Sequence, residues 1–431
     1  MSSDWPLKEL ELIANEVTVG YVGPMASEYV ENGVPFLRSL NVEPFRINAT
    51  EIKYVTPEFH KQIKKSALRP GDVAIVRTGK PGTCAVIPDW LPDANCSDLV
   101  IVRCGEKIRP RFLCYWVNSV AAHHISSHTV GAVQQHFNVG AAKKMKVAVP
   151  DISTQDAVVE VLGSIDDRIT LLRETNATLE AIAQALFKSW FVDFDPVRAK
   201  AEGRQPEGMD ATTAALFPDS FEDSELGLVP KGWTVRSLDS IADYLNGLAL
   251  QKFPPLEDAW LPVIKIAQLR KGDTVGADRA GRDIKPEYVI QNGDVLFSWS
   301  GSLEVVIWCG GEGALNQHLF KVTSAEFPKW FYYLWTRQHL PAFQHIAASK
   351  ATTMGHIQRK HLTEAKVVVP SAEVIQMLGA QVEPLLDRWL ANAEQAQTLI
   401  QLRDTLLPRL ISGQLRLPEA QAVLNDMDIA P

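Results

Sequence analysis

The chain has 431 residues, of which 46% are hydrophobic and 22% charged, values typical of a soluble globular protein with two or three domains. No apolar run is long enough to cross a bilayer, and the first ten residues carry Asp4 and Glu9 where an export signal would have a hydrophobic core, so we expect a cytoplasmic location. The net charge of −8 argues against a uniformly basic nucleic-acid binder.

The charge is unevenly distributed along the chain. Residues 1–150 hold 17 Lys and Arg against 14 Asp and Glu, and residues 226–370 hold 16 against 13. Residues 151–225 hold 6 against 16, and residues 371–431 hold 4 against 8. The pattern suits two mildly basic modules that face phosphate, separated by acidic segments that face solvent or protein.

The cysteines are odd in number and none are paired as C-x-x-C. They are Cys84, Cys96, Cys104, Cys114 and Cys309. In a cytoplasmic chain this pattern predicts reduced, mostly buried thiols. A zinc site built from the first four cysteines is an alternative, but their spacings fit no familiar ligand pattern.

The first 150 residues contain short β-rich runs that Gly, Pro and Asn turns separate, and much of this region recurs later in the chain. The matched stretches include Trp5–Ala14 with Trp233–Ala242, and His136–Pro150 with His356–Pro370, the latter without a gap. In both copies a Gly-Asp pair, at Gly71 and Gly293, precedes a central apolar run and predicts a tight turn. The sequence therefore predicts two copies of one α/β unit.

A helical period follows the first copy. Apolar or small residues recur in alternating steps of four and three at Val158, Leu162, Ile165, Ile169, Leu172, Leu179, Ala183, Leu186 and Trp190. Asn176 is the single polar residue in this series. Asp151, Ser153 and Asp156 supply helix-start signals. The spacing predicts a long helix with a coiled-coil seam.

The second copy is followed by a similar seam, formed by Leu378, Val382, Leu385, Trp389, Ala396, Leu399, Leu406 and Leu410. Asn392 and Arg403 are its polar residues. Pro384 is expected to kink or restart this helix and Pro408 to disturb its end, so we predict a less regular second helix.

Neither long helix is stable with its apolar stripe exposed, and the other helix is the nearest partner. We predict an antiparallel pair that acts as a spacer of roughly 50–60 Å at 1.5 Å per residue. Such a pair would place Asn176 opposite Asn392 and fix its register. The alternative is that both asparagines lie at the edge of the seam.

The predicted fold is α/β (α+β), with two pseudo-twofold-related α/β domains separated by two long antiparallel coiled-coil helices. The predicted segments are a first domain at 1–150, a first spacer helix at 151–194, a linker at 195–225, a second domain at 226–370, a second spacer helix at 371–415 and a C-terminal tail at 416–431.

Several sequence segments resemble those of a known protein family. They are Leu186–Gly203 (LFKSWFVDFDPVRAKAEG), Glu225–Trp233 (ELGLVPKGW), Leu410–Leu417 (LISGQLRL) and the repeated strand-Pro-helix junctions at Pro150 and Pro370. Together with the duplicated layout, they resemble the specificity subunit of type I restriction-modification enzymes. The resemblance covers essentially the whole chain.

The resemblance implies that two target recognition domains each read one half of a bipartite sequence in double-stranded DNA. It also implies that the helices set the gap between the halves and dock two methyltransferase subunits, which restriction and translocase subunits then join. S-adenosylmethionine, ATP and Mg²⁺ would belong to those partner subunits. No cofactor, metal or catalytic residue is expected in this chain, which lacks an Asn-Pro-Pro-Tyr-like methyltransferase motif and a phosphate loop.

Specific DNA contacts need polar side chains on base edges and Lys or Arg on phosphates. In the first domain the candidates are Lys61, Lys64, Lys65, Arg77, Thr78, Lys80, Gln134, Gln135, His136 and Asn138. In the second domain they are Arg270, Lys271, Arg279, Arg282, Ser298, Trp299, Ser300, Ser302, Lys350, Thr352, Thr353, His356, Gln358, Arg359 and Lys360.

Each group of candidates also has a structural interpretation. The Lys61–Lys65 cluster is more readily explained as a solvated face, and Arg77–Lys80 is equally explained as a plain hairpin. His136 and His356 occupy equivalent positions, which suits a structural role in both copies. Phe187, Trp190 and Phe191 form an apolar patch that would dock a partner subunit or pack against the chain's own domains.

Three other functions are compatible with parts of this pattern. One is the DNA-recognition subunit of a related modification or phage-defence system with a different effector. Another is an enzyme with an unrecognised active site, and the last is a coiled-coil scaffold. The basic bias and the Gln-, Asn- and His-rich loops of both domains argue against the scaffold, and salt-dependent binding to duplex DNA would exclude it.

Overall fold

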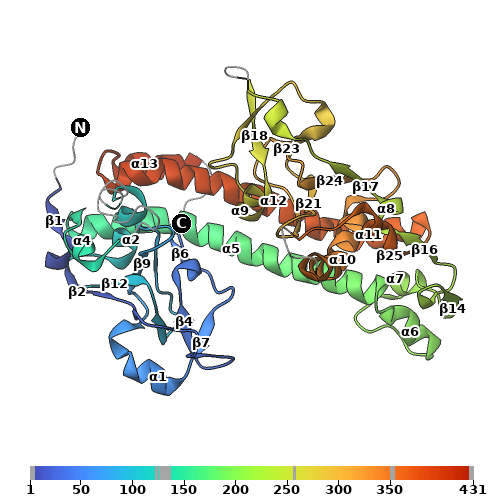
Figure 1. Cartoon of the computed structure of the whole chain (residues 1–431), viewed down its shortest axis with the longest axis horizontal. Helices are drawn as coiled ribbons and strands as arrows, with labels where there is room; N and C mark the ends of the chain where they lie inside the picture. The colour runs from blue at the N-terminus through green and yellow to red at the C-terminus, as the bar shows by residue number, and fades with distance from the viewer. Residues whose placement is uncertain (1–4, 122–124, 126–136, 256–258, 350–354, 427–431) are drawn as a thin grey trace. The chain divides into compact units, whose positions relative to one another are not determined.

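The computed structural model describes residues 5–121, 125, 137–255, 259–349 and 355–426 (Figure 1). The chain forms two compact units. Unit 1 comprises Met1–Thr170 together with Thr398–Pro431, and unit 2 comprises Leu171–Gln397. No helix in the described part of the chain combines the length and apolarity that a membrane crossing requires.

Unit 1 is built on two sheets. An antiparallel four-stranded sheet has the order β10 (Cys84–Val86), β9 (Val73–Val76), β12 (Leu99–Cys104) and β2 (Ala14–Val19). A five-stranded sheet has the order β3 (Tyr29–Val30), β7 (Lys53–Val55), β4 (Val34–Leu37), β11 (Ala94–Cys96) and β8 (Ala67–Leu68). Within it, β4 and β11 pair in parallel. The fully buried residues of β9 match the continuous apolar run that predicted this strand.

Unit 2 has the same strand order, but its second sheet has four strands where that of unit 1 has five. Its antiparallel four-stranded sheet has the order β17 (Asp243–Asn246), β24 (Leu319–Thr323), β21 (Val295–Ser298) and β22 (Val305–Ile307). The second sheet has the order β19 (Arg279–Gly281), β18 (Trp260–Ile264), β23 (Gly313–Leu315) and β20 (Val289–Ile290), and β18 and β23 pair in parallel. The shared order and the shared parallel pair confirm that the chain contains two copies of one unit.

In each copy, a strand at the start of the domain pairs with a strand at its end. In unit 1, β1 (Leu7–Glu9) pairs with β13 (Lys146–Ala148), and in unit 2, β16 (Thr234–Ser237) pairs with β25 (Lys366–Val369). Each closing strand follows a short helix, α4 (Val139–Lys143) or α11 (Arg359–Glu364), and leads into a long one. The start and end of each domain are therefore tied together at the base of a long helix.

Shorter elements complete both units. Unit 1 adds β5 (Val42–Glu43), β6 (Arg46–Ile47), α1 (Pro57–Gln62), α2 (Pro110–Ser119) and α13 (Leu417–Asp426). Unit 2 adds α6 (Asp195–Ala201), α7 (Ala211–Ala215), β14 (Phe221–Ser224), β15 (Gly227–Pro230), α8 (Leu238–Ile241), α9 (Ile266–Lys271) and α10 (Lys329–Ser349).

The two long helices are α5 (Ile152–Phe191) and α12 (Ala372–Ile411), each of 40 residues. Asp151 caps α5 by accepting a hydrogen bond from the backbone N–H of Thr154 at 2.8 Å. The predicted seam residues are largely buried, with Leu386 more deeply buried than Leu385.

Pro384 does not restart the second helix. The helix α12 continues through both Pro384 and Pro408. Pro384 and Ala380, whose carbonyl loses its usual N–H partner, are both exposed, so water can solvate that carbonyl. The two helices therefore have equal length.

Within unit 2, α5 and α12 make the predicted asparagine contact. The side-chain amide of Asn392 donates to Oδ1 of Asn176 at 3.0 Å, and the amide of Asn176 donates to the carbonyl of Trp389 at 2.8 Å. The two asparagines are 2% and 8% exposed, which excludes the alternative that they lie at the edge of the seam.

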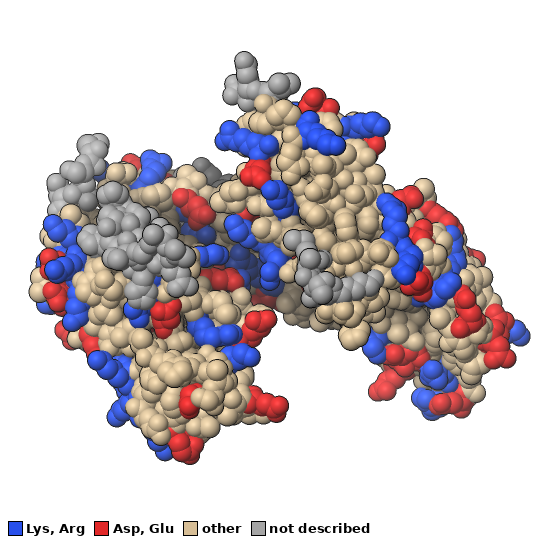
Figure 2. All heavy atoms as spheres, viewed as in Figure 1, with Lys and Arg blue, Asp and Glu red and all other residues tan. Residues whose placement is uncertain are grey.

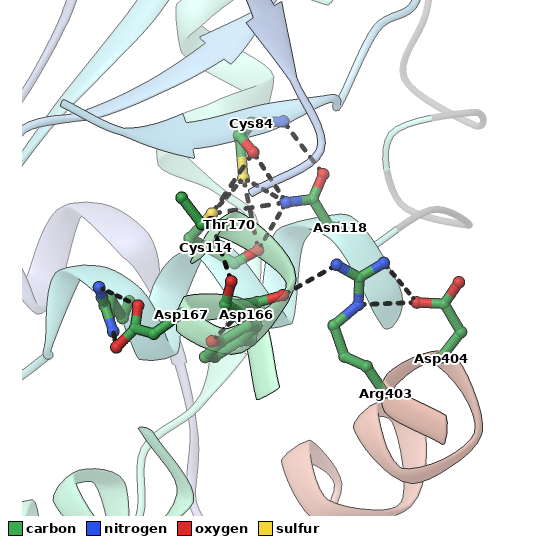
Figure 3. Close-up of polar contacts among 10 residues, drawn as sticks. Cys84, Cys114, Asn118, Asp166, Asp167, Thr170, Arg403 and Asp404 are labelled. Atoms are coloured by element: carbon green, nitrogen blue, oxygen red, sulfur yellow. Dashed lines mark hydrogen bonds and ion pairs between the residues drawn. The ribbon is translucent and has the colours of Figure 1, made fainter. Parts of the chain in front are cut away.

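Within unit 1, the same two helices make a charged contact (Figure 3). The guanidinium of Arg403 on α12 donates to the carboxylate of Asp166 on α5 at 2.9 Å and lies over the ring of Phe45 at 4.4 Å. The hydroxyl of Tyr115 donates to the same carboxylate at 2.7 Å. The polar seam residue Arg403 therefore makes its contacts with Asp166 and Phe45 within unit 1.

The thiols of unit 1 are part of its interior. Cys84 and Cys114 lie with their sulfur atoms 3.5 Å apart, and the amide of Asn118 donates to both backbone carbonyls (Figure 3). Burial raises the pKa of the Cys84 thiol well above its ordinary value. All five cysteines are free, as predicted, and three of them are buried.

The core of unit 2 is strongly aromatic. Phe187 and Phe191 of α5 pack against Phe331 and Trp335 of α10, with ring centroids 5.1–6.5 Å apart. Val382 and Leu378 of α12 join the same cluster. The long helices therefore contribute directly to the core of this unit.

Candidate nucleic-acid interface

In unit 2 the loop after the central strand lies against the segment that precedes α11. The N–H of Ile357 donates to the carbonyl of Trp299 at 3.0 Å, and the N–H of Gly301 donates to the carbonyl of Gly355 at 2.8 Å. Ser300 and His356 form an isolated antiparallel bridge. Two stretches far apart in sequence, both containing candidate contact residues, therefore form one surface.

Trp299 is at the centre of this surface. Its indole N–H donates to Oδ1 of Asn246 at 2.9 Å, and its ring lies 5.9 Å from that of His318 and 6.3 Å from that of His356. The hydroxyl of Ser300 is 3.0 Å from Nδ1 of His318. The half-buried indole is thus surrounded by polar groups that can donate or accept hydrogen bonds.

The serines of the same loop have different roles. Ser298 is buried, and its hydroxyl donates to the carbonyl of Ser302 at 2.6 Å and accepts from the N–H of Glu304 at 2.8 Å. These bonds close the loop, so Ser298 shapes the surface. Ser302 is exposed.

Cationic and amide groups flank the loop. Gln358, Arg359 and Lys360 are exposed at the start of α11. Arg359 donates to the carbonyl of Tyr244 at 2.9 Å and lies 5.5 Å from the ring centre of Phe320. The guanidinium is held in place while its outer face remains accessible, as a phosphate contact requires.

Acidic groups balance several of the predicted basic residues of unit 2. Arg270 lies 3.1 Å from the carboxylate of Glu304, and Arg282 pairs with Glu312. Burial raises the pKa of Glu304, and the charge of Arg270 opposes this rise. Arg279 stacks over the ring of Trp260 at 4.2 Å.

Figure 2 shows the resulting mixture of Lys, Arg and acidic side chains over the part of unit 2 that contains β18 and β23. Lys271, in the last turn of α9, is exposed.

The equivalent surface of unit 1 has different side chains. Arg77 follows β9 and is only 9% exposed, with its Nε donating to the carbonyl of Phe137 at 3.4 Å and its guanidinium 3.8 Å from the carboxylate of Asp98. Thr78 is half-buried and Lys80 is exposed. The loop therefore presents its polar groups around a mostly buried arginine.

The other candidates of unit 1 are arranged as follows. Lys61, Lys64 and Lys65 are exposed at the end of α1 and in the short helix η3 (Lys64–Ser66). Asn138 caps α4 by accepting from the N–H of Ala141 at 2.8 Å. Gln134, Gln135, His136, Lys350, Thr352 and Thr353 lie outside the described residues.

For the three aromatic candidates the structure favours one of the two interpretations that the sequence left open. Phe187, Trp190 and Phe191 are 2%, 2% and 0% exposed and belong to the core of unit 2. Their competing interpretation, packing against the chain's own domain, describes them in this structure. An apolar patch on a helix cannot by itself reveal which surface covers it.

Sequence reasoning did not select Asp98, His318 or Asn246, although all three line these surfaces. A signal was present, because Asp98 and His318 each begin a short β-rich run, at Asp98–Val102 and His318–Val322. The matching position of the two runs in the repeat identifies both residues as equivalent. Among the described residues, no cluster of three or more His, Cys, Asp or Glu side chains is arranged to hold a metal.

Several known proteins are similar to this chain. Residues 230–383 match the family of the type I restriction modification DNA specificity domain. The chain is 22% identical over 430 residues to the type I restriction enzyme MjaIX specificity subunit of Methanocaldococcus jannaschii, covering 96% of this chain and 94% of that protein. It is 26% identical over 317 residues to the type I restriction enzyme HindI specificity subunit of Haemophilus influenzae, covering 63% and 69% of the two chains.

A solved structure shares the fold. The crystal structure of a type I restriction-modification system S subunit from M. genitalium has a TM-score of 0.54 at 12% identity, covering 94% of this chain and 96% of that one. The chain is therefore similar to type I specificity subunits along almost its whole length, and its residues 230–383 match the type I restriction modification DNA specificity domain.

Proposed function

We propose that this chain is the sequence-specific DNA-binding subunit of a type I restriction-modification enzyme and reads a bipartite target in double-stranded DNA. The observation that carries the proposal is the duplicated domain. Two copies of one topology, one of them matched by the specificity-domain family, present the same loop with different side chains. Two domains of this kind suit the reading of two different half-sequences.

Each domain contains the groups that DNA recognition needs. In unit 2, exposed Arg359 and Lys360 suit contacts to phosphates, and Gln358, Ser302 and the group around Trp299 suit contacts to base edges. In unit 1, Lys80, Lys64 and Lys65 suit phosphates.

The long helices suit a spacer and a docking platform. Each runs without interruption for 40 residues, a length of about 60 Å, and contributes to both units. We propose that they set the unread gap between the half-sites and bind two methyltransferase subunits, which restriction subunits then join. The chain would supply no catalytic residue, and S-adenosylmethionine, ATP and Mg²⁺ would be bound by those partners. The complex would act in the cytoplasm.

The test is to co-express the chain with its neighbouring methyltransferase and to map methylated adenines across the host genome. Methyltransferase expressed without this chain is the control. The expected result is one split motif, with two specified blocks around a fixed unspecified gap. A continuous motif would contradict independent reading by two domains. Methylation no different from the control would favour a related defence system with another effector.

A further inference from the structure

The loop after the central strand has the same backbone arrangement in both units. The N–H of Arg77 donates to the carbonyl of Asp98 at 3.4 Å, and the N–H of Trp299 donates to the carbonyl of His318 at 3.3 Å. The carbonyls of Arg77 and Trp299 then each accept from the segment before the next short helix, in both cases at 3.0 Å. Arg77 and Trp299 therefore occupy one structural position, and Asp98 and His318 another.

The side chains at these two positions have different chemistry. Unit 1 has an arginine and a carboxylate 3.8 Å apart. Unit 2 has an indole and an imidazole with ring centres 5.9 Å apart. The main-chain hydrogen bonds at these positions are preserved, while the side chains change from an ion pair to an aromatic pair. These side chains therefore do not serve a structural purpose that the two units share.

Both pairs have a part that a ligand can reach. The side chain of Asp98 is 40% exposed, while that of Arg77 is 10% exposed. Asp98 also has a φ of 56°, a left-handed conformation that is uncommon outside glycine and that recurs at functional sites. In unit 2, Trp299 and His318 are both partly exposed.

We propose that positions 77 and 98 in unit 1, and 299 and 318 in unit 2, determine which base pairs the two domains select. The proposal rests on the proposed function and names the residues that would make the two half-sequences different. Asp98, oriented by Arg77, accepts a hydrogen bond from the amino group of a cytosine or adenine. Trp299 offers an apolar face to a base edge such as the thymine methyl, and His318 hydrogen-bonds beside it.

The test uses the whole chain co-expressed with its methyltransferase, and genome-wide adenine methylation as the readout. Asp98→Asn keeps the shape of the side chain but replaces one acceptor oxygen with a donor. Trp299→Leu removes the aromatic face. Each variant is expected to relax or change a position within one block only, a different block for each variant, with discrimination at that position reduced about tenfold or more.

Matched controls lie in the loop between β10 and β11 of unit 1. Asp89→Asn and Trp90→Leu make the same chemical changes at exposed residues. Both are expected to leave the motif unchanged. If Trp299→Leu does not fold, as judged by circular dichroism, Trp299→Phe replaces it, because it keeps a ring while removing the indole N–H that binds Asn246.

The outcomes separate this proposal from the proposed function. A split motif in the wild type that neither variant alters would overturn the inference and leave the function standing. Relaxation of both blocks at once, or loss of all methylation by a folded variant that still binds the methyltransferase, would also overturn it, because the residues would then support binding in general. Absence of any split motif in the wild type would overturn the proposed function itself.

Discussion

The contact between Asn176 and Asn392 leads to a sharp prediction about single and double substitutions. The side chains are almost fully buried and joined by one hydrogen bond of 3.0 Å. Replacing Asn392 with Leu leaves Oδ1 of Asn176 without that donor, while replacing Asn176 with Leu leaves the amide of Asn392 without that acceptor. Replacing both removes the polar groups together.

The expected magnitudes follow from burial. A buried polar group that loses its partner costs about 1–3 kcal/mol, whereas replacing both partners with apolar groups of similar shape is close to neutral. Leu shares the branching of Asn at Cγ. Each single variant is therefore expected to lower the free energy of unfolding by about 1–3 kcal/mol, and the double variant by less than either.

The assay is urea denaturation of the whole chain followed by its helical circular dichroism. Gln395→Leu, at an exposed position of α12, is the control and is expected to change the free energy of unfolding by about 0.5 kcal/mol or less. Strictly additive effects in the double variant would refute the reasoning, because they would mean that the two amides do not interact energetically.

Three further predictions concern the helices and the unit 2 core. Arg403→Met removes the charge that pairs with Asp166, whose side chain is 18% exposed, and should lower the free energy of unfolding by about 3 kcal/mol; a neutral effect in urea denaturation would mean that the pair is effectively solvated. Pro384→Ala restores a helix N–H at an exposed position and should raise the melting temperature, since proline costs about 3 kcal/mol in a helix interior; a fall would reveal a contact made by the ring. Burial lowers the pKa of His339, whose Nε2 lies 2.9 Å from the carbonyl of Lys366, below its ordinary value of 6.5. The folded state therefore binds a proton at His339 less readily than the unfolded state does. The stability that neutral His339 contributes is fully present above about pH 6.5 and is lost as the pH falls through the folded-state pKa. Below about pH 6.5 the melting temperature of the wild type should fall relative to that of His339→Gln. Parallel curves of melting temperature against pH for the two proteins would contradict this.

The long helices and their contact were predictable because a repeating period constrains many residues at once. The seam through Val158, Leu172 and Ala183 fixes which face of α5 is buried, and the matching seam of α12 supplies the partner. With both seams defined, the positions of Asn176 and Asn392 in the pair followed. The duplicated strands were predictable for a similar reason, since each copy supports the interpretation of the other.

Features that depend on solvent exposure were not predictable in this way. The effect of Pro384 depends on whether the carbonyl that it leaves unpaired can reach water, and a sequence pattern does not give that. The sequence could not decide whether Phe187 docks a partner or packs within the chain, because α10, which covers this residue, lies more than 100 residues further along the chain. The grouping of Trp299 with Asn246 and His318 likewise depends on pairing between distant strands.

The division of the chain into units has a consequence for folding during synthesis. Unit 2 is one continuous segment, Leu171–Gln397, whereas unit 1 needs Thr398–Pro431 as well as its first 170 residues. When the ribosome has added residue 397, all of unit 2 has been made, but Arg403, the partner of Asp166, has not. We expect the domain made first to be the last to reach its final stability, which makes unit 1 the part of the nascent protein most dependent on chaperones.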